Sequence, residues 1–196
     1  MNYLAHVFLS GEDEEIVIGN FIGDYVKGIN FRKYSDSVKK GILLHREIDA
    51  FTDRNKTIRK SKSLFKNRYG KYSGIIIDIF YDHFLAKNWS KFSSVPLKDF
   101  TLNLHKILNK HFDILPERVK QFVPSFINNN WIEYYKSVFG IKQVLKRMSS
   151  ITTLPDETSY AINVLKDNYS VLESDFLDYF PELTAYVAGR YNIYFR

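Results

Sequence analysis

Apolar residues recur at helical spacing through almost the whole chain. No segment alternates apolar and polar residues for long enough to indicate a β-strand. Pro96, Pro116, Pro155 and Pro181 each precede an amphipathic stretch, where proline suits the first turn of a helix. The pattern predicts an all-α fold of eight to ten helices. The length of 196 residues fits one domain over residues 1–196.

The first half of the chain divides into five expected helices, and the last of them is almost wholly apolar. They cover about residues 3–9, 14–26, 36–51, part of 54–70, and 72–89. In the second half, Pro124 should end or kink the helix that follows Pro116, because proline lacks the N–H that a helix interior uses. Pro181 should begin the last helix.

Two carboxylates interrupt the most apolar run, GIIIDIFYDHFLAKNW. In a helix Asp78 and Asp82 share one face, since residues four apart are neighbours. Burying carboxylates without compensation is costly, and a bound cation is the simplest compensation. We expect Asp78, deepest in the run, to be a direct ligand. Asp82, beside His83, is expected to support a ligand or relay a proton.

A second His/Asp pair lies in GILLHREIDAFTD, where His45 and Asp49 are one helical turn apart. Such a pair can coordinate a metal; a surface ion pair is the alternative interpretation. Arg46 could stabilise negative charge on a phosphoryl group, or it could form a structural salt bridge.

Two further polar residues stand in apolar helices near the N-terminus. Asp24 follows Phe21 and Ile22, and His6 lies between Ala5 and Val7. Each has an ordinary alternative, a surface aspartate or a hydrogen-bonded core histidine. Taken together, the mixed His and carboxylate set within the first 83 residues predicts a site for Mn²⁺, Mg²⁺, Fe²⁺ or Zn²⁺. The absence of Cys excludes thiolate ligands and disulfides.

The net charge of +6 comes from one segment. Residues 54–71 hold eight Lys or Arg and no acid, out of 28 basic and 22 acidic residues in the chain. A concentrated positive patch attracts an anionic partner, although a solvated basic helix is the alternative. The expected partner-binding residues are Arg54, Lys56, Arg59, Lys60, Lys62, Lys66 and Arg68.

The N-terminus turns acidic at once in MNYLAHVFLSGEDEE and has no positive leader, so it is not expected to be a signal peptide. No apolar run approaches the about 18 residues that span a bilayer. A cytoplasmic location without membrane attachment is the expectation, and the oligomeric state is left open.

Four ordered segments resemble those of the acyl carrier protein phosphodiesterases: MNYLAH, GNFIGDYVKG, GILLHREIDAFTD and RYGKYSGIIIDIFYDHFLAKNW. A fifth, GIKQVLKRMSS, resembles a weaker family segment, so the resemblance spans essentially the whole chain. That family is similar to the HD-domain metal phosphohydrolases, which implies an HD-like fold. Its activity implies metal-dependent removal of 4′-phosphopantetheine from holo acyl carrier protein, with Mn²⁺ the usual metal.

The resemblance implies a site drawn from these motifs. We assign metal binding to Asp24, His45, Asp49 and Asp78, and catalysis to His6, Arg46, Asp82 and His83. The sequence departs from HD proteins in having no His-Asp dipeptide, only Asp82-His83 in reverse order. Gly23 stands where the family pattern favours Ala, a change expected to touch no ligand.

The basic segment then acquires an acidic carrier protein as its expected partner. Two alternatives remain: an HD-like phosphohydrolase of nucleotides or other small phosphoesters, and a non-catalytic binder of acidic partners. Nucleic acid is not expected, because nucleic-acid binding would explain the basic segment but not the buried acids.

Overall fold

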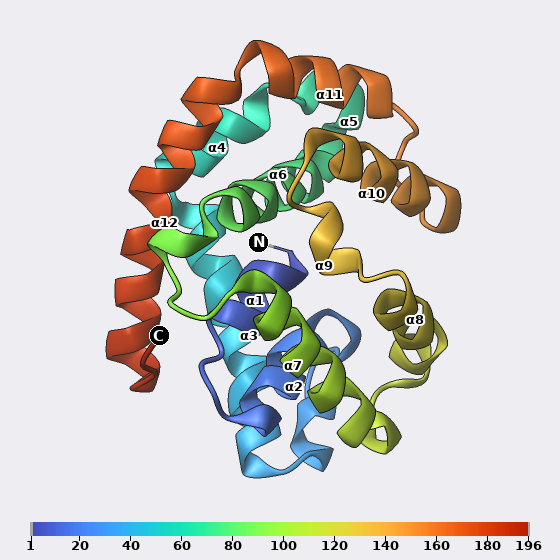
Figure 1. Ribbon diagram of the computed structural model, residues 1–196, viewed down its shortest axis with the longest axis vertical. Helices are drawn as coiled ribbons and strands as arrows, with labels where there is room; N and C mark the ends of the chain where they lie inside the picture. Colours follow the sequence, from blue (N-terminus) through green and yellow to red (C-terminus); the bar gives the residue numbers. More distant parts are fainter. Residues whose placement is uncertain (1, 196) are drawn as a thin grey trace.

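The computed structural model describes residues 2–195, in which helices joined by short turns form the whole fold (Figure 1). No β-strand occurs in this range. Among these residues ten α-helices have six residues or more, while α5 and α9 are single turns of four residues. The prediction of an all-α fold with eight to ten helices is confirmed.

The α-helices are α1 (Tyr3–Phe8), α2 (Glu14–Phe21), α3 (Asp36–Arg54), α4 (Lys56–Ser63), α5 (Lys66–Tyr69), α6 (Ser73–Lys87), α7 (Leu97–Lys110), α8 (Glu117–Asn128), α9 (Trp131–Tyr134), α10 (Val138–Ile151), α11 (Thr158–Asp167) and α12 (Tyr169–Tyr191). Short 3-10 helices are η1 (Gly23–Tyr25), η2 (Asn30–Lys33), η3 (Gly70–Tyr72), η4 (Trp89–Lys91) and η5 (Phe112–Ile114).

Proline positions in the second half were predicted less well. Pro181 does not begin a helix but lies inside α12, and α8 continues past Pro124 to Asn128. The buried face of α12 is continuous on both sides of Pro181, with Phe180 and Leu183 fully buried. Burial of that face outweighs the one helical hydrogen bond that proline removes.

The N-terminal helix lies in the middle of the fold rather than at its edge. Helix α1 packs against α2 on one side and α6 on the other, and α2 packs along α3 (Figure 1). Two glycines allow α2 and α3 to touch through their backbones. A Cβ on Gly19 would lie 2.1 Å from the Val38 carbonyl oxygen, and one on Gly41 would lie 2.3 Å from that of Ile16. This close crossing places the end of α2 directly beside the middle of α3.

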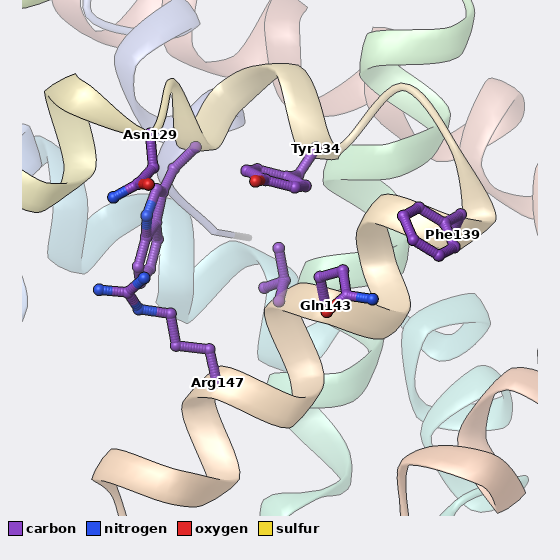
Figure 2. Close-up of a pocket in the computed structure, with 7 residues that line it drawn as sticks. Asn129, Tyr134, Phe139, Gln143 and Arg147 are labelled. Atoms are coloured by element: carbon purple, nitrogen blue, oxygen red, sulfur yellow. The ribbon is translucent and has the colours of Figure 1, made fainter.

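In the second half, α9 and α10 line a cavity of about 290 Å³ together with the residue that follows α8 (Figure 2). The Arg147 guanidinium lies 4.6 Å from the centre of the Trp131 ring and donates a hydrogen bond to Ser125 Oγ. The lining residues are Asn129, Trp131, Tyr134, Phe139, Gln143, Val144 and Arg147.

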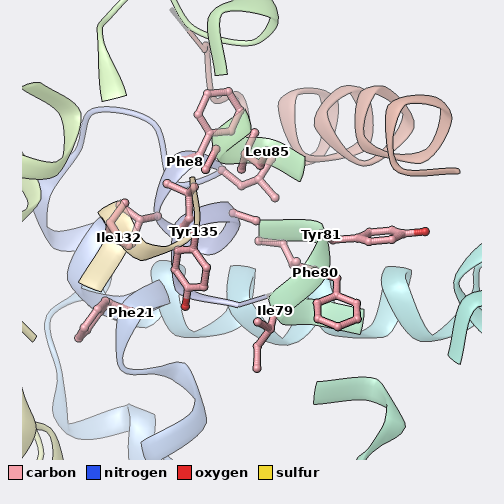
Figure 3. Packing of buried hydrophobic residues seen from close by; sticks show 14 of the residues in the cluster. Phe8, Phe21, Ile79, Phe80, Tyr81, Leu85, Ile132 and Tyr135 are labelled. Carbon is pink, nitrogen blue, oxygen red and sulfur yellow. The ribbon is translucent and has the colours of Figure 1, made fainter. Parts of the chain in front are cut away.

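One cluster of buried apolar side chains joins elements from both ends of the chain, from Leu4 to Ile193. Its members include the aromatic residues Phe80 and Tyr81 of α6 and Tyr135 (Figure 3). Within the described residues, none of the helices has the length and apolar character needed to cross a membrane. The buried residues of α6 make core contacts on most sides of the helix, as its apolar sequence predicted.

Candidate metal centre

Four of the predicted residues come together where α1, η1 and α3 meet. The His6 and His45 rings stack with centroids 4.0 Å apart and planes inclined by 16°. Asp49 reaches both: Oδ1 lies 3.3 Å from His6 Nε2, and Oδ2 lies 3.3 Å from His45 Nε2. Asp24 Oδ1 lies 3.5 Å from His45 Nε2. The expected pair of His45 and Asp49 on α3 is thus joined by His6 from α1 and Asp24 from η1.

The two ring nitrogens of each histidine have different surroundings. His45 Nδ1 lies 2.8 Å from the Asn20 carbonyl oxygen, and His6 Nδ1 lies 2.8 Å from Asn20 Oδ1. Both Nε2 atoms are buried, and neither has an aligned hydrogen-bond partner among the described residues. Buried nitrogens directed at a carboxylate and left without a hydrogen bond are the arrangement of metal ligands. His6, His45 and Asp49 can bring one donor atom each to within 4.8 Å of one another.

Burial divides the cluster into a nitrogen side and an oxygen side. His6 is 3% exposed and His45 6% exposed. The Asp49 side chain is 44% exposed and that of Asp24 74% exposed. The histidines therefore form the buried side of the cluster, and the carboxylates lie at the surface, where a substrate can approach.

The charges in the cluster are strongly coupled. Burial lowers the pKa of His45, but contact with Asp24 and Asp49 outweighs this and raises it to about 9. Burial and the adjacent His45 charge lower the pKa of His6 to about 4. Burial raises the pKa of Asp49, yet its contacts with the two histidines hold it well below the usual range. The carboxylates of Asp24 and Asp49 therefore favour positive charge at this position, whether it is carried by His45 or by a bound cation.

Asp78 lies near this cluster on α6. It is half-buried, and burial raises its pKa, with the Asp49 charge acting in the same direction and the Lys62 charge opposing it. Its neighbours thus include one candidate ligand and one residue of the basic segment. Asp78 is not among the three residues whose donor atoms converge.

Asp82 and His83 occupy a separate buried position on α6. Asp82 Oδ1 accepts hydrogen bonds from the backbone N–H groups of Asn2 at 3.3 Å and Ala5 at 3.2 Å, and Oδ2 accepts one from Leu4 at 2.7 Å. The carboxylate thus binds the orphan N–H groups at the start of α1. Burial raises its pKa to about 7, against the opposing effect of these N–H groups.

His83 uses both ring nitrogens away from the cluster. Nδ1 lies 2.6 Å from the Tyr135 carbonyl oxygen and Nε2 lies 2.8 Å from the Tyr169 hydroxyl. Both ring nitrogens of His83 therefore have partners within the core, and the side chain does not join His6 and His45.

Arg46 also points to backbone rather than to the cluster. Its Nη2 donates to the carbonyl oxygens of Val26 and Gly28, both at 2.9 Å, and its guanidinium lies 5.2 Å from the centre of the Phe31 ring. These contacts hold the loop that follows Asp24. Among the described residues Arg46 forms no salt bridge to an acidic residue, which was one of the two alternatives for it.

Two contacts at the cluster were not anticipated. Gly23 was expected to touch no ligand, but an added Cβ there would lie 2.2 Å from His45 Cγ. The glycine is what allows the His45 ring to pack against the backbone before Asp24. Asn20 contacts both histidines. The one available signal was an asparagine within an apolar helix, which predicts a polar partner in the core.

The basic segment begins at Arg54, the last residue of α3, and continues through α4 and α5 into η3. Six of its seven predicted residues are exposed, and Lys62 is half-buried. Asp53 engages two of them: Lys62 Nζ lies 2.6 Å from its carboxylate, and Arg59 Nε donates to its backbone oxygen. Arg68 lies 3.6 Å from Glu157. In the described part of the chain, no carboxylate lies within ion-pair distance of Lys56, Lys60 or Lys66.

The cavity between α9 and α10 (Figure 2) does not compete as a metal centre. Its lining contains amides, aromatic rings and one guanidinium, but no histidine and no carboxylate. Divalent cations need such donors, so the His6–His45 cluster is the better candidate.

Comparison with known proteins agrees with the motifs. The family model described as acyl carrier protein phosphodiesterase matches residues 1–183. A protein named acyl carrier protein phosphodiesterase from Serratia proteamaculans (strain 568) is 29% identical over 184 residues, covering 93% of this chain and 95% of its own length. Proteins of the same name from Enterobacter sp. (strain 638) and Escherichia coli O45:K1 (strain S88 / ExPEC) are 30% and 31% identical, each covering 93% of this chain and 95% of its own length. No solved structure matches the chain. The chain belongs to the acyl carrier protein phosphodiesterase family.

Proposed function

We propose that this protein is a metal-dependent phosphodiesterase that removes 4′-phosphopantetheine from holo acyl carrier protein. Family membership supports the phosphodiesterase activity and the carrier protein as substrate. One observation carries the metal dependence: both buried Nε2 atoms of His6 and His45 lie at Asp49 without a hydrogen-bond partner among the described residues.

In this proposal His6, His45 and Asp49 hold a divalent cation, with Asp24 as a further oxygen donor. Such a cation, when bound, supplies Lewis-acid activation of water and of a phosphoryl oxygen. Mixed imidazole and carboxylate ligands suit Mn²⁺, the leading candidate, and also Fe²⁺ and Zn²⁺, with Mg²⁺ less favoured by imidazole. Asp78 lies close enough to influence Asp49 and is proposed to support the centre or extend it.

The remaining assignments follow from where the side chains lie. The exposed carboxylate of Asp24 is available to accept a proton from the attacking water. Attack on phosphorus breaks the P–O bond to the carrier protein serine, whose oxygen takes up a proton. Asp82, His83 and Arg46 act in this proposal by holding α1, the core and the loop after Asp24, rather than by touching substrate.

The exposed lysines of α4 and α5 are proposed to dock the acidic carrier protein. Helix α4 packs on α3 and α6, which carry the cluster and Asp78, so a partner bound there lies beside the site. Because Arg59 and Lys62 already contact Asp53, the cleaner test uses Lys56, Lys60 and Lys66.

The activity test incubates purified protein with holo acyl carrier protein and Mn²⁺ and follows the mass of the carrier. We expect loss of the prosthetic group, abolished by EDTA and by His45→Ala. His111→Ala is the matched control, since His111 pairs with Glu14 away from the cluster. Turnover of nucleotides or small phosphoesters alone would favour an HD-like phosphohydrolase, and the absence of Mn²⁺ binding would favour a non-catalytic binder.

The docking test is a triple reversal, Lys56→Glu, Lys60→Glu and Lys66→Glu. We expect KM for holo carrier protein to rise about tenfold or more at low salt, with kcat little changed and the difference shrinking as salt screens the charges. Lys98→Glu, Lys106→Glu and Lys146→Glu, on α7 and α10, make a control of equal charge. Equal KM values for the two folded triple variants would reject the docking surface.

A further inference from the structure

Asn20 is a buried asparagine whose side-chain oxygen and nitrogen both have hydrogen-bond partners. It is 0% exposed and lies in the last turn of α2. Its Nδ2 donates to the His6 carbonyl oxygen at 2.7 Å and to Ser10 Oγ at 2.9 Å. Ser10 Oγ in turn donates to the same His6 carbonyl at 2.8 Å. The amide orientation is therefore set by two acceptors, which leaves Oδ1 as the acceptor directed at His6.

This orientation determines which nitrogen of His6 carries the proton. Oδ1 lies 2.8 Å from His6 Nδ1, and an amide oxygen can only accept. Nδ1 must then donate, so neutral His6 has its lone pair on Nε2, the atom that lies 3.3 Å from Asp49 Oδ1. Neutral histidine in water prefers the opposite tautomer, so the environment of Nδ1 has to impose this one.

The backbone of Asn20 fixes the tautomer of His45 by the same kind of contact. Its carbonyl oxygen accepts from His45 Nδ1 at 2.8 Å, which again directs Nε2 to Asp49. The close crossing of α2 and α3 at Gly19 and Gly41 is what brings this carbonyl to the His45 ring. One residue thus contacts both histidines, through its side chain on one and through its backbone on the other.

We infer that Asn20 is a positioning residue whose side-chain amide holds His6 as the Nδ1–H tautomer, so that Nε2 is presented as a ligand. Its value for metal binding rests on the proposed function, but the tautomer does not. The division between side chain and backbone also separates the two histidines. A substitution of the Asn20 side chain removes the partner of His6 and leaves the carbonyl contact of His45 in place.

The test reads the tautomer directly by long-range ¹H–¹⁵N NMR of the histidine rings in metal-free full-length protein at neutral pH. We expect wild-type His6 to be the Nδ1–H tautomer. Asn20→Leu, of similar volume, should convert it to the Nε2–H tautomer, with Nε2–H donating to Asp49. Asn20→Asp keeps an acceptor at Oδ1 and should retain the Nδ1–H form. Asn88→Leu is the matched control, because Asn88 is a buried asparagine at the C-cap of α6 that contacts Phe84 and Glu173 instead.

Mn²⁺ binding measured by calorimetry provides the second readout. Loss of a partner that orients a metal-binding histidine weakens affinity by about 10–100-fold, which is the decrease expected for Asn20→Leu and not for Asn88→Leu. An Nε2–H signal for wild-type His6 would overturn the inference even if Asn20→Leu failed to fold. An Nδ1–H signal in a protein that binds no Mn²⁺ would instead overturn the proposed metal centre and leave the positioning role intact.

Discussion

The His6–His45 cluster and the Asp82–His83 pair are built from the same two residue types, yet their polar atoms have different partners. Asp82 accepts three backbone hydrogen bonds, and both nitrogens of His83 have partners. In the cluster each histidine is held through Nδ1 while Nε2 has no hydrogen bond among the described residues. A buried group that is fully paired within the protein supports the fold, whereas one that is held on one side and left open on the other is arranged for a ligand.

Replacing one histidine from each region should give the largest difference. His45→Ala removes a proposed ligand and should lower kcat/KM by at least about a thousand-fold, equal to about 4 kcal/mol. His83→Gln keeps polar atoms near Tyr135 and Tyr169 and should retain most of the turnover. Release of the prosthetic group measured by mass spectrometry compares the two variants, with circular dichroism confirming their fold. A folded but inactive His83→Gln protein would place the α6 pair in the site.

Stability should show the reverse order. Asp82→Ala leaves three backbone N–H groups without an acceptor, those of Leu4 and Ala5 buried and that of Asn2 half-buried, and should lower the free energy of unfolding by about 3 kcal/mol. Asp24→Ala removes a side chain that is 74% exposed and should change it by less than about 1 kcal/mol. Urea denaturation of the metal-free proteins measures both. Similar losses for the two variants would mean that the cluster, too, is built mainly for stability.

Gly23→Ala tests how tightly the cluster is positioned. Its Cβ would lie 2.2 Å from His45 Cγ, so the ring has to move or the backbone has to open. We expect a loss of about 2 kcal/mol in stability together with weaker Mn²⁺ binding. Gly74→Ala is the control, since its Cβ would meet only the end of the Lys62 side chain at 3.5 Å. Unchanged Mn²⁺ affinity in Gly23→Ala would show that His45 does not need its observed position.

The pH dependence of stability should give the smallest effect. Burial lowers the pKa of His83, so below its unfolded value of about 6.5 the unfolded chain binds more protons than the folded one. Stability therefore falls as the pH drops through this range, by at most about 1.4 kcal/mol per pH unit for one group. His83→Gln should flatten the slope between pH 7 and 5, measured by thermal unfolding. His105, also buried with a lowered pKa, remains in both proteins, so the difference between them reports His83.

The sequence predicted the helical class, the family and the convergence of His6, Asp24, His45 and Asp49, because periodicity and motif order are local properties. It could not separate Asp82 from these residues. A carboxylate in an apolar helix is equally consistent with a metal ligand and with an acceptor for another helix's N–H groups. Which of the two roles Asp82 has depends on the contact of α6 with α1, and Asp82 is 80 residues from Asn2 in the sequence.

The backbone contacts of Arg46 and the position of Pro181 within a helix were missed for the same reason. The carbonyl groups that Arg46 binds belong to a loop whose path is set by where η1 ends, and the helix around Pro181 continues because its buried face does. The role of Asn20 likewise depends on the crossing of α2 and α3 at two glycines. None of these long-range contacts can be predicted from local sequence propensity.

The division of the cluster into buried nitrogens and exposed oxygens has a consequence for how the proposed ion would enter and leave the site. The helices that hold the histidines are anchored by apolar burial and backbone hydrogen bonds, so we expect the metal-free chain to fold, unlike a zinc finger. The carboxylates already face water, which lets an ion exchange from the surface without opening the bundle. Occupancy of the proposed site would then follow the supply of metal in the surroundings, and the activity of the folded protein would rise and fall with that supply.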